Sequence, residues 1–416
     1  MNRQSEPVLR IGSGASKALA GFLRKRRSLS ARLVADASTW AARGASLARE
    51  LEAEGIRVLA TRYDETALVA DARSILKLFT EAADREETLV AVGSGTITDI
   101  VRFVAHRSGR EFVSIPTAPS VDAYSSIVAP ILIDGVKRTL TACAPLAIFA
   151  DLDVLAAAPR PMLSAGFGDM ICKFSAIADW RLGALLWDEG YDPRIAERSL
   201  KAARSCMDCA AGIGAADAPA VGRLMEALLE SGSCMAEAGH SRPASGAEHQ
   251  YSHFWEMRLL REGRPPILHG LKVGVATVLT ARLWDRVRAL SAGEARRAFD
   301  TCRPPAPDEE RRAIATAFGA EAAEIESGQR RFLELGAEGR SALAAKAAER
   351  WEDILEIARI VPDESTTRSL LEAALCPTEP LQLGLEARDI ELAQSSAHFL
   401  RDRLTVRKLA RLLFGE

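Results

Sequence analysis

Residues 88–126, TLVAVGSGTITDIVRFVAHRSGREFVSIPTAPSVDAYSS, place two strand-like runs on either side of a helix-like run. Residues 88–92 are apolar and rich in β-branched side chains, which predicts a buried strand. That strand ends at the turn Gly93-Ser94-Gly95, and apolar residues then recur at helical spacing, which predicts a helix beginning near Thr96. A strand, a glycine turn and a helix N-terminus together favour phosphate, because glycine lets the backbone approach and the free N–H groups attract an anion.

The glycine turn leaves two interpretations open. A G-x-G pattern with no third glycine is not the full dinucleotide fingerprint, so a nucleotide site and an ordinary strand-to-helix turn fit it equally well. A second apolar strand is predicted at residues 112–115, and it ends in the segment PTAPS, residues 116–120. Small and hydroxyl-bearing residues of this kind suit a loop that wraps around a ligand.

The residues before this segment alternate between strand and helix patterns. The predicted strands are residues 8–14, 32–35 and 58–63, and the predicted helices are residues 41–54 and 67–85. This alternation is typical of a parallel α/β sheet, so we expect a Rossmann-like N-terminal domain. The run RLVAD ends in Asp36, a carboxylate that suits either an adenosine ribose or the cap of the next helix.

After residue 126 the pattern changes in two steps. A hairpin is predicted over residues 128–141, with its turn at Asp134-Gly135, and a short strand over residues 147–150. From Leu155 onward helical periodicity replaces the strand patterns. We therefore expect an α/β nucleotide-binding domain at residues 1–158 and an all-helical domain at residues 159–416. Within the second domain, residues 390–413 predict an amphipathic surface helix.

Composition excludes several classes of protein. The 416 residues suffice for two or three domains, and a hydrophobic content of 48% is typical of globular proteins. A formal net charge of −2 gives no electrostatic reason to expect binding to nucleic acid or membrane. We expect a cytoplasmic protein, since no apolar run is long enough to span a bilayer and the first residues lack a signal-peptide core. The seven cysteines are expected to be free thiols, and Cys206 and Cys209 are more typical of a helix face than of a zinc or redox site.

Three of the six histidines, His249, His253 and His269, lie close together in the sequence. His249 and His253 are four residues apart and would share one face of a helix, while His269 begins another apolar helical run. A metal site could draw histidines from two such helices, although histidines also serve as helix caps and core hydrogen-bond donors. The pattern H-x-x-x-H lacks the glutamate of metalloproteases, which argues against peptide hydrolysis. Asp169, in GFGDM, is expected to begin a helix and to cap it unless it binds a ligand.

Taken together, these motifs resemble the sn-glycerol-1-phosphate dehydrogenases, including the bacterial branch named after the arabinose operon. That family belongs to the superfamily of iron-type alcohol dehydrogenases and dehydroquinate synthases. The resemblance covers residues 11 to about 280, with the motifs in the right order. The matching segments are GSGTITD at 93–99, PTAPSVD at 116–122, FADLD at 149–153, GFGD at 166–169, SGAEH at 245–249, SHFWE at 252–256 and HG at 269–270.

The resemblance implies which residues form the site. Its metal ligands fall on Asp169, His249 and His269, a set that suits zinc or nickel, or iron. Its substrate contacts fall on Asp122, Asp169 and His253. Its nucleotide, NAD or NADP, would contact Asp36, Gly93, Gly95, Thr96, Ile97, Thr98, Asp99, Thr117, Ala118, Pro119, Ser120 and Ser126. Three positions depart from the family pattern: Thr98 stands where we expect asparagine, Arg102 where we expect lysine, and Leu271 where we expect a polar residue.

The implied reaction is the reduction of dihydroxyacetone phosphate to sn-glycerol 1-phosphate and the reverse oxidation, by a homo-oligomer, expected to be a dimer. His253 is expected to move the proton or to orient the substrate. Lys137, Arg138 and Arg258 are candidates for the substrate phosphate, with surface solvation as the simpler interpretation of each. Three alternatives stay open: a sugar-phosphate cyclase or lyase of the dehydroquinate synthase type, a dehydrogenase for another small phosphorylated ketone or polyol, and a non-catalytic nucleotide-binding homologue.

Overall fold

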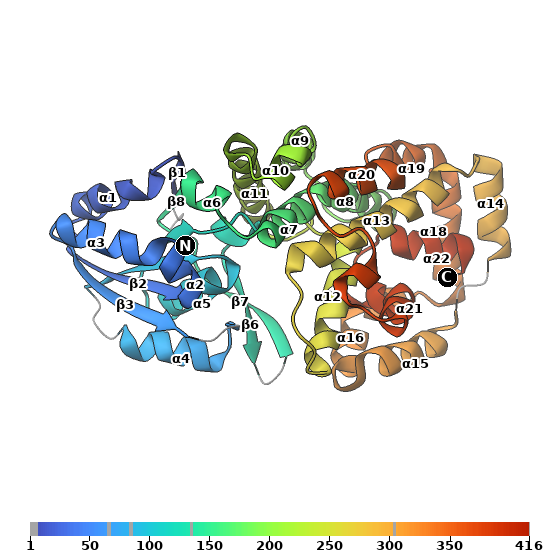
Figure 1. The fold of residues 1–416 in the computed structure, drawn as a ribbon. Coiled ribbons are helices and arrows are strands. Elements are labelled where there is room, and N and C mark those ends of the chain that lie inside the picture. The colour runs from blue at the N-terminus through green and yellow to red at the C-terminus, as the bar shows by residue number, and fades with distance from the viewer. Residues whose placement is uncertain (1–6, 65–67, 83–85, 134–135, 303–304, 416) are drawn as a thin grey trace. The chain divides into compact units, whose positions relative to one another are not determined.

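The computed structural model describes residues 7–64, 68–82, 86–133, 136–302 and 305–415 (Figure 1). The chain forms two compact units, each described here by itself. The first comprises residues 1–170 and 208–237, and the second comprises residues 171–207 and 238–416. These units divide the chain differently from the expected domains 1–158 and 159–416, because residues 159–170 and the helical segment 208–237 pack with the first unit.

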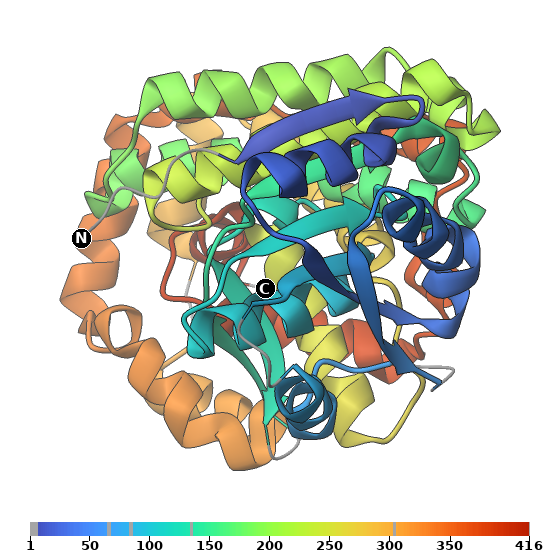
Figure 2. The ribbon, with the colours of Figure 1, turned by 90° about the vertical axis from the view of Figure 1, so that its left-hand side faces the viewer.

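A six-stranded sheet forms the centre of the first unit (Figure 2). Every pairing within it is parallel, which confirms the predicted α/β class. In spatial order its strands are β1 (Val8–Gly12), β8 (Ala147–Asp151), β5 (Phe112–Pro116), β4 (Thr88–Gly93), β2 (Ser30–Asp36) and β3 (Arg57–Tyr63). The predicted hairpin is a separate antiparallel pair, β6 (Val128–Ile133) and β7 (Val136–Thr141), and its expected turn at Asp134-Gly135 lies outside the described residues.

Helices bury both faces of the sheet. Alternate side chains of β4 enter opposite apolar layers, with Val90 and Val92 in one layer and Leu89 and Ala91 in the other. A strand covered on both faces has no polar side to display, which is why residues 88–92 are continuously apolar. The helical segments of this part of the chain are η1 (Ala15–Ala18), α1 (Leu19–Lys25), α2 (Ala37–Thr39), η2 (Trp40–Gly44), α3 (Ala45–Ala53), α4 (Ala72–Glu81), α5 (Gly95–Arg107) and η3 (Ala123–Ser125).

The strand order contains a topological switch point between β2 and β4. From β2 the chain forms β3 on one side, and then crosses to form β4 on the other side. In open parallel sheets ligands bind beyond the carboxyl ends of the strands at such a point. Asp36 ends β2 and Gly93 ends β4. Both predicted nucleotide-binding positions therefore flank the switch point.

Among the described residues of the first unit, four further helices come after β8 in the sequence, two of them in the segment 208–237. Gly166, within α7, allows this helix to approach the loop after β5, since a Cβ atom there would lie 1.8 Å from the carbonyl oxygen of Pro119. The prediction that a helix begins at Asp169 is wrong, because α7 begins at Arg160 and Asp169 lies in its last turn. These helices are α6 (Leu152–Ala156), α7 (Arg160–Ile171), α10 (Ala210–Ala215) and α11 (Ala218–Ala238).

The described residues of the second unit form helices and loops, with no strand. Trp284 and Trp351 are fully buried in one apolar cluster and Trp255 in another. The principal helices are α8 (Lys173–Trp187), α9 (Pro193–Met207), α12 (Ala247–Arg261), α13 (His269–Arg288), α14 (Ala292–Thr301), α15 (Pro307–Phe318), α16 (Ala322–Gly328), α17 (Arg330–Leu333), α18 (Gly336–Glu349), α19 (Trp351–Ala358), α20 (Glu364–Ala373), α21 (Ala387–Ser396) and α22 (Val406–Phe414). Short turns of helix join them at η4 (Gly319–Glu321), η5 (Pro380–Leu383) and η6 (Ala397–Leu400).

The prediction of one surface helix over residues 390–413 is wrong. The helical run is interrupted between α21 and α22, and all of residues 406–413 in α22 are buried. The cysteine prediction is confirmed, since no disulfide joins any of the seven cysteines in the part of the chain that the structure describes. Across the part of the chain that the structure describes, no helix combines the length and the apolar character needed to cross a bilayer.

Candidate active site

The glycine turn after β4 leads directly into α5. Ser94 is the N-cap residue and Gly95 the first helical residue. A Cβ atom on Gly93 would lie 2.6 Å from the Cβ of Ile97, so only glycine permits this tight passage from strand to helix. The first N–H groups of a helix have no acceptor within it, and the helix dipole adds to their positive potential. The turn thus offers backbone donors to an anion at the switch point.

Two polar side chains at the start of α5 form hydrogen bonds to other groups of the protein. Thr98 donates its hydroxyl to the Ser94 carbonyl at 2.9 Å, and Asp99 accepts from the buried guanidinium of Arg102 at 3.0 Å. Arg102 also donates to the carbonyl of Val128 at 3.1 Å and to that of Tyr124 at 2.8 Å. Arg102, which stands where the family pattern has lysine, therefore has a structural role. Its guanidinium links α5 to the segment that follows the loop after β5.

The loop after β5 is buried, and it lies against the glycine turn. Thr117 donates its N–H to the Gly93 carbonyl at 3.3 Å. The hydroxyl of Tyr124 donates to the carbonyl of Ala118. Burial raises the pKa of Tyr124 to about 12, so this phenol keeps its proton at neutral pH. Residues 117–120 thus form a fixed wall beside the turn, whereas Ser126, farther on, is half-buried and bonds to Val128.

Asp36 caps the helix that follows β2. Its Oδ1 accepts the N–H of Thr39 at 2.8 Å, and the Thr39 hydroxyl accepts the N–H of Asp36 at 3.0 Å. This reciprocal pattern is a capping box. The cap and a ribose contact use different lone pairs of one carboxylate, so the two interpretations of Asp36 are compatible.

Asp122 and Asp169 are in direct contact. The N–H of Asp122 donates to Oδ2 of Asp169 at 3.1 Å, and Oδ2 of Asp122 accepts the hydroxyl of Ser231 at 2.8 Å. Asp169 is buried, with 1% of its surface exposed. The hydrogen bond from Asp122 holds Oδ2 of Asp169 and thereby fixes the direction of the other carboxylate oxygen, Oδ1. The segment after the β5 loop therefore orients Asp169.

The three clustered histidines of the second unit lie on two neighbouring helices. His269 is the first residue of α13, and His249 and His253 are one turn apart on α12. The ring centroids are 5.2 Å apart for His249 and His269, 6.0 Å for His249 and His253, and 5.4 Å for His253 and His269. Burial, and then the neighbouring imidazoles, hold the pKa of His269 well below its usual value. His269 is therefore neutral, the form that binds a metal.

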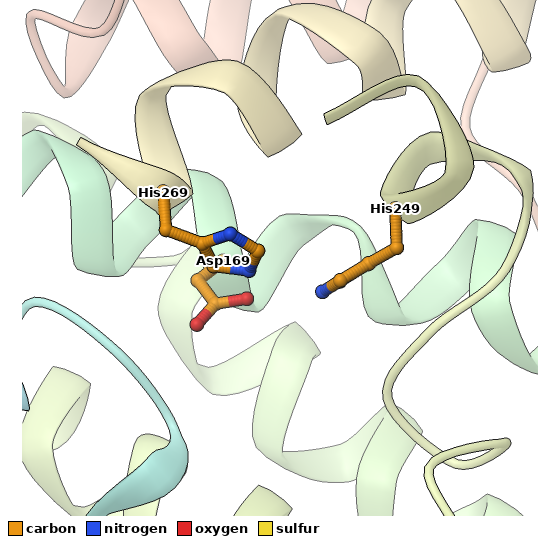
Figure 3. Close-up of side chains that lie close together, drawn as sticks. All are labelled: Asp169, His249 and His269. Carbon is orange, nitrogen blue, oxygen red and sulfur yellow. The ribbon is translucent and has the colours of Figure 1, made fainter. Parts of the chain in front are cut away.

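Asp169, His249 and His269 each offer one ligand atom, and these atoms lie within 4.8 Å of one another (Figure 3). One carboxylate and two imidazoles are a donor set that suits zinc and other divalent transition metals. The Nδ1 atom of His249 lies 3.0 Å from Oε1 of the buried Glu248. Such a carboxylate orients the ring and leaves Nε2 for the metal. The residues present therefore fit a divalent ion.

Several residues around this group escaped the sequence prediction. Two further sets of potential ligand atoms share its histidines: Cys172 and Glu248 with His249, and Glu256 with His253 and His269. Glu256 lies 3.5 Å from Nδ1 of His253 and 3.7 Å from the buried ammonium of Lys272. The sequence offered one indication of these two residues. Glu256 and Lys272 each follow a clustered histidine by three residues, a spacing that places side chains next to each other on a helix.

The structure tests two of the candidates for a phosphate-binding cation. Arg258 is buried rather than solvated, and its guanidinium bonds to Asp389 at 2.8 Å and to Glu262 at 2.6 Å. The interpretation of Arg258 as a surface residue is therefore wrong, and its donors already serve two carboxylates. Arg138 is exposed, and the side chain of Lys137 lies outside the described residues.

Comparisons with known proteins relate this chain to dehydrogenases. Residues 10–159 match the family "Iron-containing alcohol dehydrogenase". The chain is 34% identical to the glycerol-1-phosphate dehydrogenase [NAD(P)+] of Geobacillus thermodenitrificans over 94% of this chain and 88% of that protein. It is 42% identical to that of Geobacillus stearothermophilus over 67% of this chain and 69% of the relative. Among solved structures, an iron-containing alcohol dehydrogenase from Corynebacterium glutamicum has a TM-score of 0.62 at 19% identity, over 99% of this chain and 95% of that one. This last likeness shows the shared fold.

Proposed function

This chain belongs to the glycerol-1-phosphate dehydrogenase family, and we propose that it reduces dihydroxyacetone phosphate to sn-glycerol 1-phosphate with NADH or NADPH, and catalyses the reverse oxidation. The observation that carries the proposal is the group Asp169, His249 and His269, whose ligand atoms gather within 4.8 Å of one another. Three protein ligands leave coordination positions open for a substrate oxygen.

The first unit supplies the nucleotide-binding residues in this proposal. The helix N-terminus after Gly93 and Gly95 receives the pyrophosphate, while Asp36 contacts the adenosine ribose. The buried loop 117–120 and Ser126 hold the rest of the nucleotide. Asp36 favours the free ribose hydroxyls of NAD, and the [NAD(P)+] specificity in the relatives' names supports acceptance of both nucleotides. In this account the protein positions the nicotinamide, and the hydride chemistry belongs to the cofactor.

Asp169, His249 and His269 would hold one divalent ion, which is zinc, nickel or iron. When bound, the ion acts as a Lewis acid that polarises the substrate carbonyl and stabilises the negative charge developing on its oxygen. Asp122 orients Asp169 through its backbone N–H and offers its own carboxylate to a substrate hydroxyl. The carboxylate of Glu248 would keep His249 in the tautomer that leaves Nε2 to hold the ion.

His253 is the proposed proton donor in the reduction. It follows His249 by one turn and presents its ring to the same group of histidines. Its Nδ1 lies 3.5 Å from Glu256, and in this proposal Nε2 is the nitrogen that faces the substrate. An imidazole suits this task because its ordinary pKa is near neutrality. Lys272, whose ammonium lies 3.7 Å from Glu256, supplies positive charge for the dianionic substrate in this proposal.

A single assay separates this function from its alternatives. Purified protein loaded with zinc or nickel is mixed with NADH and dihydroxyacetone phosphate, and the loss of absorbance at the nicotinamide band is followed. One NADH consumed per ketone reduced supports the dehydrogenase, whereas a cyclase regenerates its cofactor and releases phosphate instead. Turnover only with a different phosphorylated ketone would replace the proposed substrate. The absence of any turnover would favour a non-catalytic homologue.

A further inference from the structure

The helix that carries His249, α12, is capped by a residue without a side chain. Its N-cap residue is Gly246, so the cap itself offers no side-chain acceptor to the first N–H groups of the helix. Two buried carboxylates take that place. The N–H of Ala247 donates to Oδ2 of Asp179 at 2.7 Å, and the N–H of Gly246 donates to Oε1 of Glu248 at 2.6 Å. The start of α12 is therefore held from α8, on which Asp179 lies, as well as from within the helix.

The same carboxylate of Asp179 also holds the start of α22. Its Oδ1 accepts the N–H of Val406, the first residue of α22, at 2.6 Å. The N-cap residue of that helix, Thr405, makes no capping hydrogen bond with its side chain. Asp179 is buried completely, with 0% of its surface exposed. Since a carboxylate at a helix N-terminus satisfies N–H groups that have no acceptor within the helix, this one side chain links the ends of two helices.

The segment before α22 makes further bonds around the start of α12. Arg403 donates to the carbonyl of Ser245, which precedes α12, at 2.9 Å. The hydroxyl of Thr405 donates to Oε1 of Gln250 at 3.4 Å. Gln250 directly follows His249 in the sequence. The C-terminal segment therefore bonds to the chain on both sides of His249.

Gly246 is required by the space between two carboxylates. Its φ of −116° does not by itself demand glycine. A Cβ atom there would lie 2.6 Å from Oδ2 of Asp179 and 2.9 Å from Oε2 of Glu248. The Glu248 carboxylate in turn lies 3.0 Å from Nδ1 of His249. A displacement of these carboxylates would therefore reach the histidine ring through that contact.

We propose that Asp179 is a positioning residue for the metal ligand His249, and that the C-terminal helix α22 acts on the metal site through it. The inference rests on the role of His249 in the proposed function, and it adds a role for the C-terminal part of the chain. A ligand whose helix is already fixed at its first turn loses less freedom when the ion binds, so the ion binds more tightly. Asp179 acts through the backbone of Ala247 rather than on the ion itself.

Two variants disturb this link in different ways. Gly246→Ala keeps every hydrogen-bonding group but displaces both carboxylates. Asp179→Asn replaces one oxygen with an amide nitrogen, which cannot accept a hydrogen bond, so one helix end loses its partner whichever way the amide turns. Burial, and then the nearby carboxylate of Glu248, raise the pKa of Asp179 to about 8. Either protonation state leaves both oxygens of Asp179 able to accept an N–H, so this comparison does not depend on the pH.

Competition between the purified full chain and a zinc-binding dye measures the affinity for Zn²⁺ without any turnover. Both variants should bind the ion about tenfold or more weakly, the usual effect of losing a group that orients a metal ligand. With Co²⁺ in place of zinc, the visible absorption bands should shift, because they report how the ligands are arranged. Gly328→Ala is the control for the glycine substitution, since a Cβ there meets nothing within 4 Å. It should leave the affinity and the bands unchanged.

A second control separates positioning from a general loss of stability. Asp363→Ala removes the carboxylate that caps α20, whose Oδ1 accepts the N–H of Thr366 at 2.7 Å. It should lower the melting temperature of the protein, because a lost helix cap is destabilising, and leave the Zn²⁺ affinity unchanged. An equal loss of affinity in Asp363→Ala would overturn the proposal, since the effect would then follow stability alone.

Unchanged Zn²⁺ affinity and unchanged Co²⁺ bands in the folded variants would also overturn the proposal and make Asp179 purely structural. If His249→Ala weakens Zn²⁺ binding and the two variants do not, only this inference fails. If His249→Ala has no effect either, the metal site of the proposed function fails as well. Circular dichroism melts accompany each variant. Should neither Gly246→Ala nor Asp179→Asn fold, Arg403→Met decides the outcome, because it removes the bond to Ser245 from a half-buried position and should weaken Zn²⁺ binding in the same direction.

Discussion

The backbone N–H of Asp122 donates to Oδ2 of Asp169 at 3.1 Å. Asp122 directly follows the buried loop after β5, and Asp169 is the carboxylate of the candidate metal group. One hydrogen bond thus joins the segment proposed to hold the nucleotide to the residue proposed to hold the ion. A change on either side of this bond is expected to affect both sites.

Gly166→Ala tests this connection. The new Cβ would lie 1.8 Å from the carbonyl oxygen of Pro119, and backbone atoms must move to relieve the overlap. We expect a loss of about 1–3 kcal/mol in the free energy of unfolding, as for other overpacked sites, together with weaker NADH binding. Thermal melts and fluorescence titration measure the two effects. Gly21→Ala is the matched control, since a Cβ there meets nothing within 4 Å and alanine favours the helix. A Gly166→Ala protein as stable as the control would refute the close approach.

His249→Ala and His269→Ala should each lose the bound ion, because each removes one of three protein ligands. Elemental analysis after gentle purification is expected to find about one equivalent of zinc, nickel or iron in the unmodified protein and much less in the variants. His106→Ala, which removes an exposed histidine of the first unit, should keep its metal. Full occupancy in both ligand variants would rule out this metal site.

Gly95→Val should weaken nucleotide binding while leaving the metal in place. The branched side chain would stand at the first position of α5, where a phosphate is proposed to approach the backbone. A Cβ at Gly95 already comes within 3.3 Å of the Val121 side chain, which has room to adjust, so the fold should persist. The dissociation constant of NADH is the measurement, with metal content as the internal control. An unchanged constant would contradict the proposed nucleotide position.

His253→Ala should keep the ion and lose turnover by about 100-fold or more, the usual effect of removing a positioned acid–base group. His253→Asn should restore little of the rate, because an amide donates a hydrogen bond but does not titrate near neutrality. Metal analysis and steady-state rates separate the possible roles. Loss of the ion in His253→Ala would make His253 a ligand, and near-normal turnover would make it structural.

Much of the first unit could be predicted from the sequence, because its strands are buried on both faces. Residues 88–92 and 112–115 are continuously apolar for that reason, and both form central strands of the sheet. Asp169 was placed wrongly because GFGD contains two glycines, which usually mark a turn. Here Gly166 lies inside α7 and permits a close approach to Pro119, a long-range contact that local sequence does not reveal.

The charged helix α22 is an element whose burial could not be predicted from the sequence. Its basic residues predict exposure, yet Arg411 is buried against Glu310, which is distant in the sequence. Counter-charges of this kind become visible only in three dimensions. Within the candidate site the histidine cluster was recognisable from its spacing, whereas the bond between Asp122 and Asp169 was not, since it joins residues far apart in the chain.

The most direct test of the account is the identity of the product that the metal-loaded protein makes from dihydroxyacetone phosphate and NADH. We expect NADH loss to match product formation one for one, with the product identified as the sn-1 phosphate by enantiomer-specific assay. Removal of the ion by a chelator should abolish the reaction, and adding zinc or nickel should restore it. Formation of the sn-3 enantiomer, or full activity without a divalent ion, would contradict the central claim.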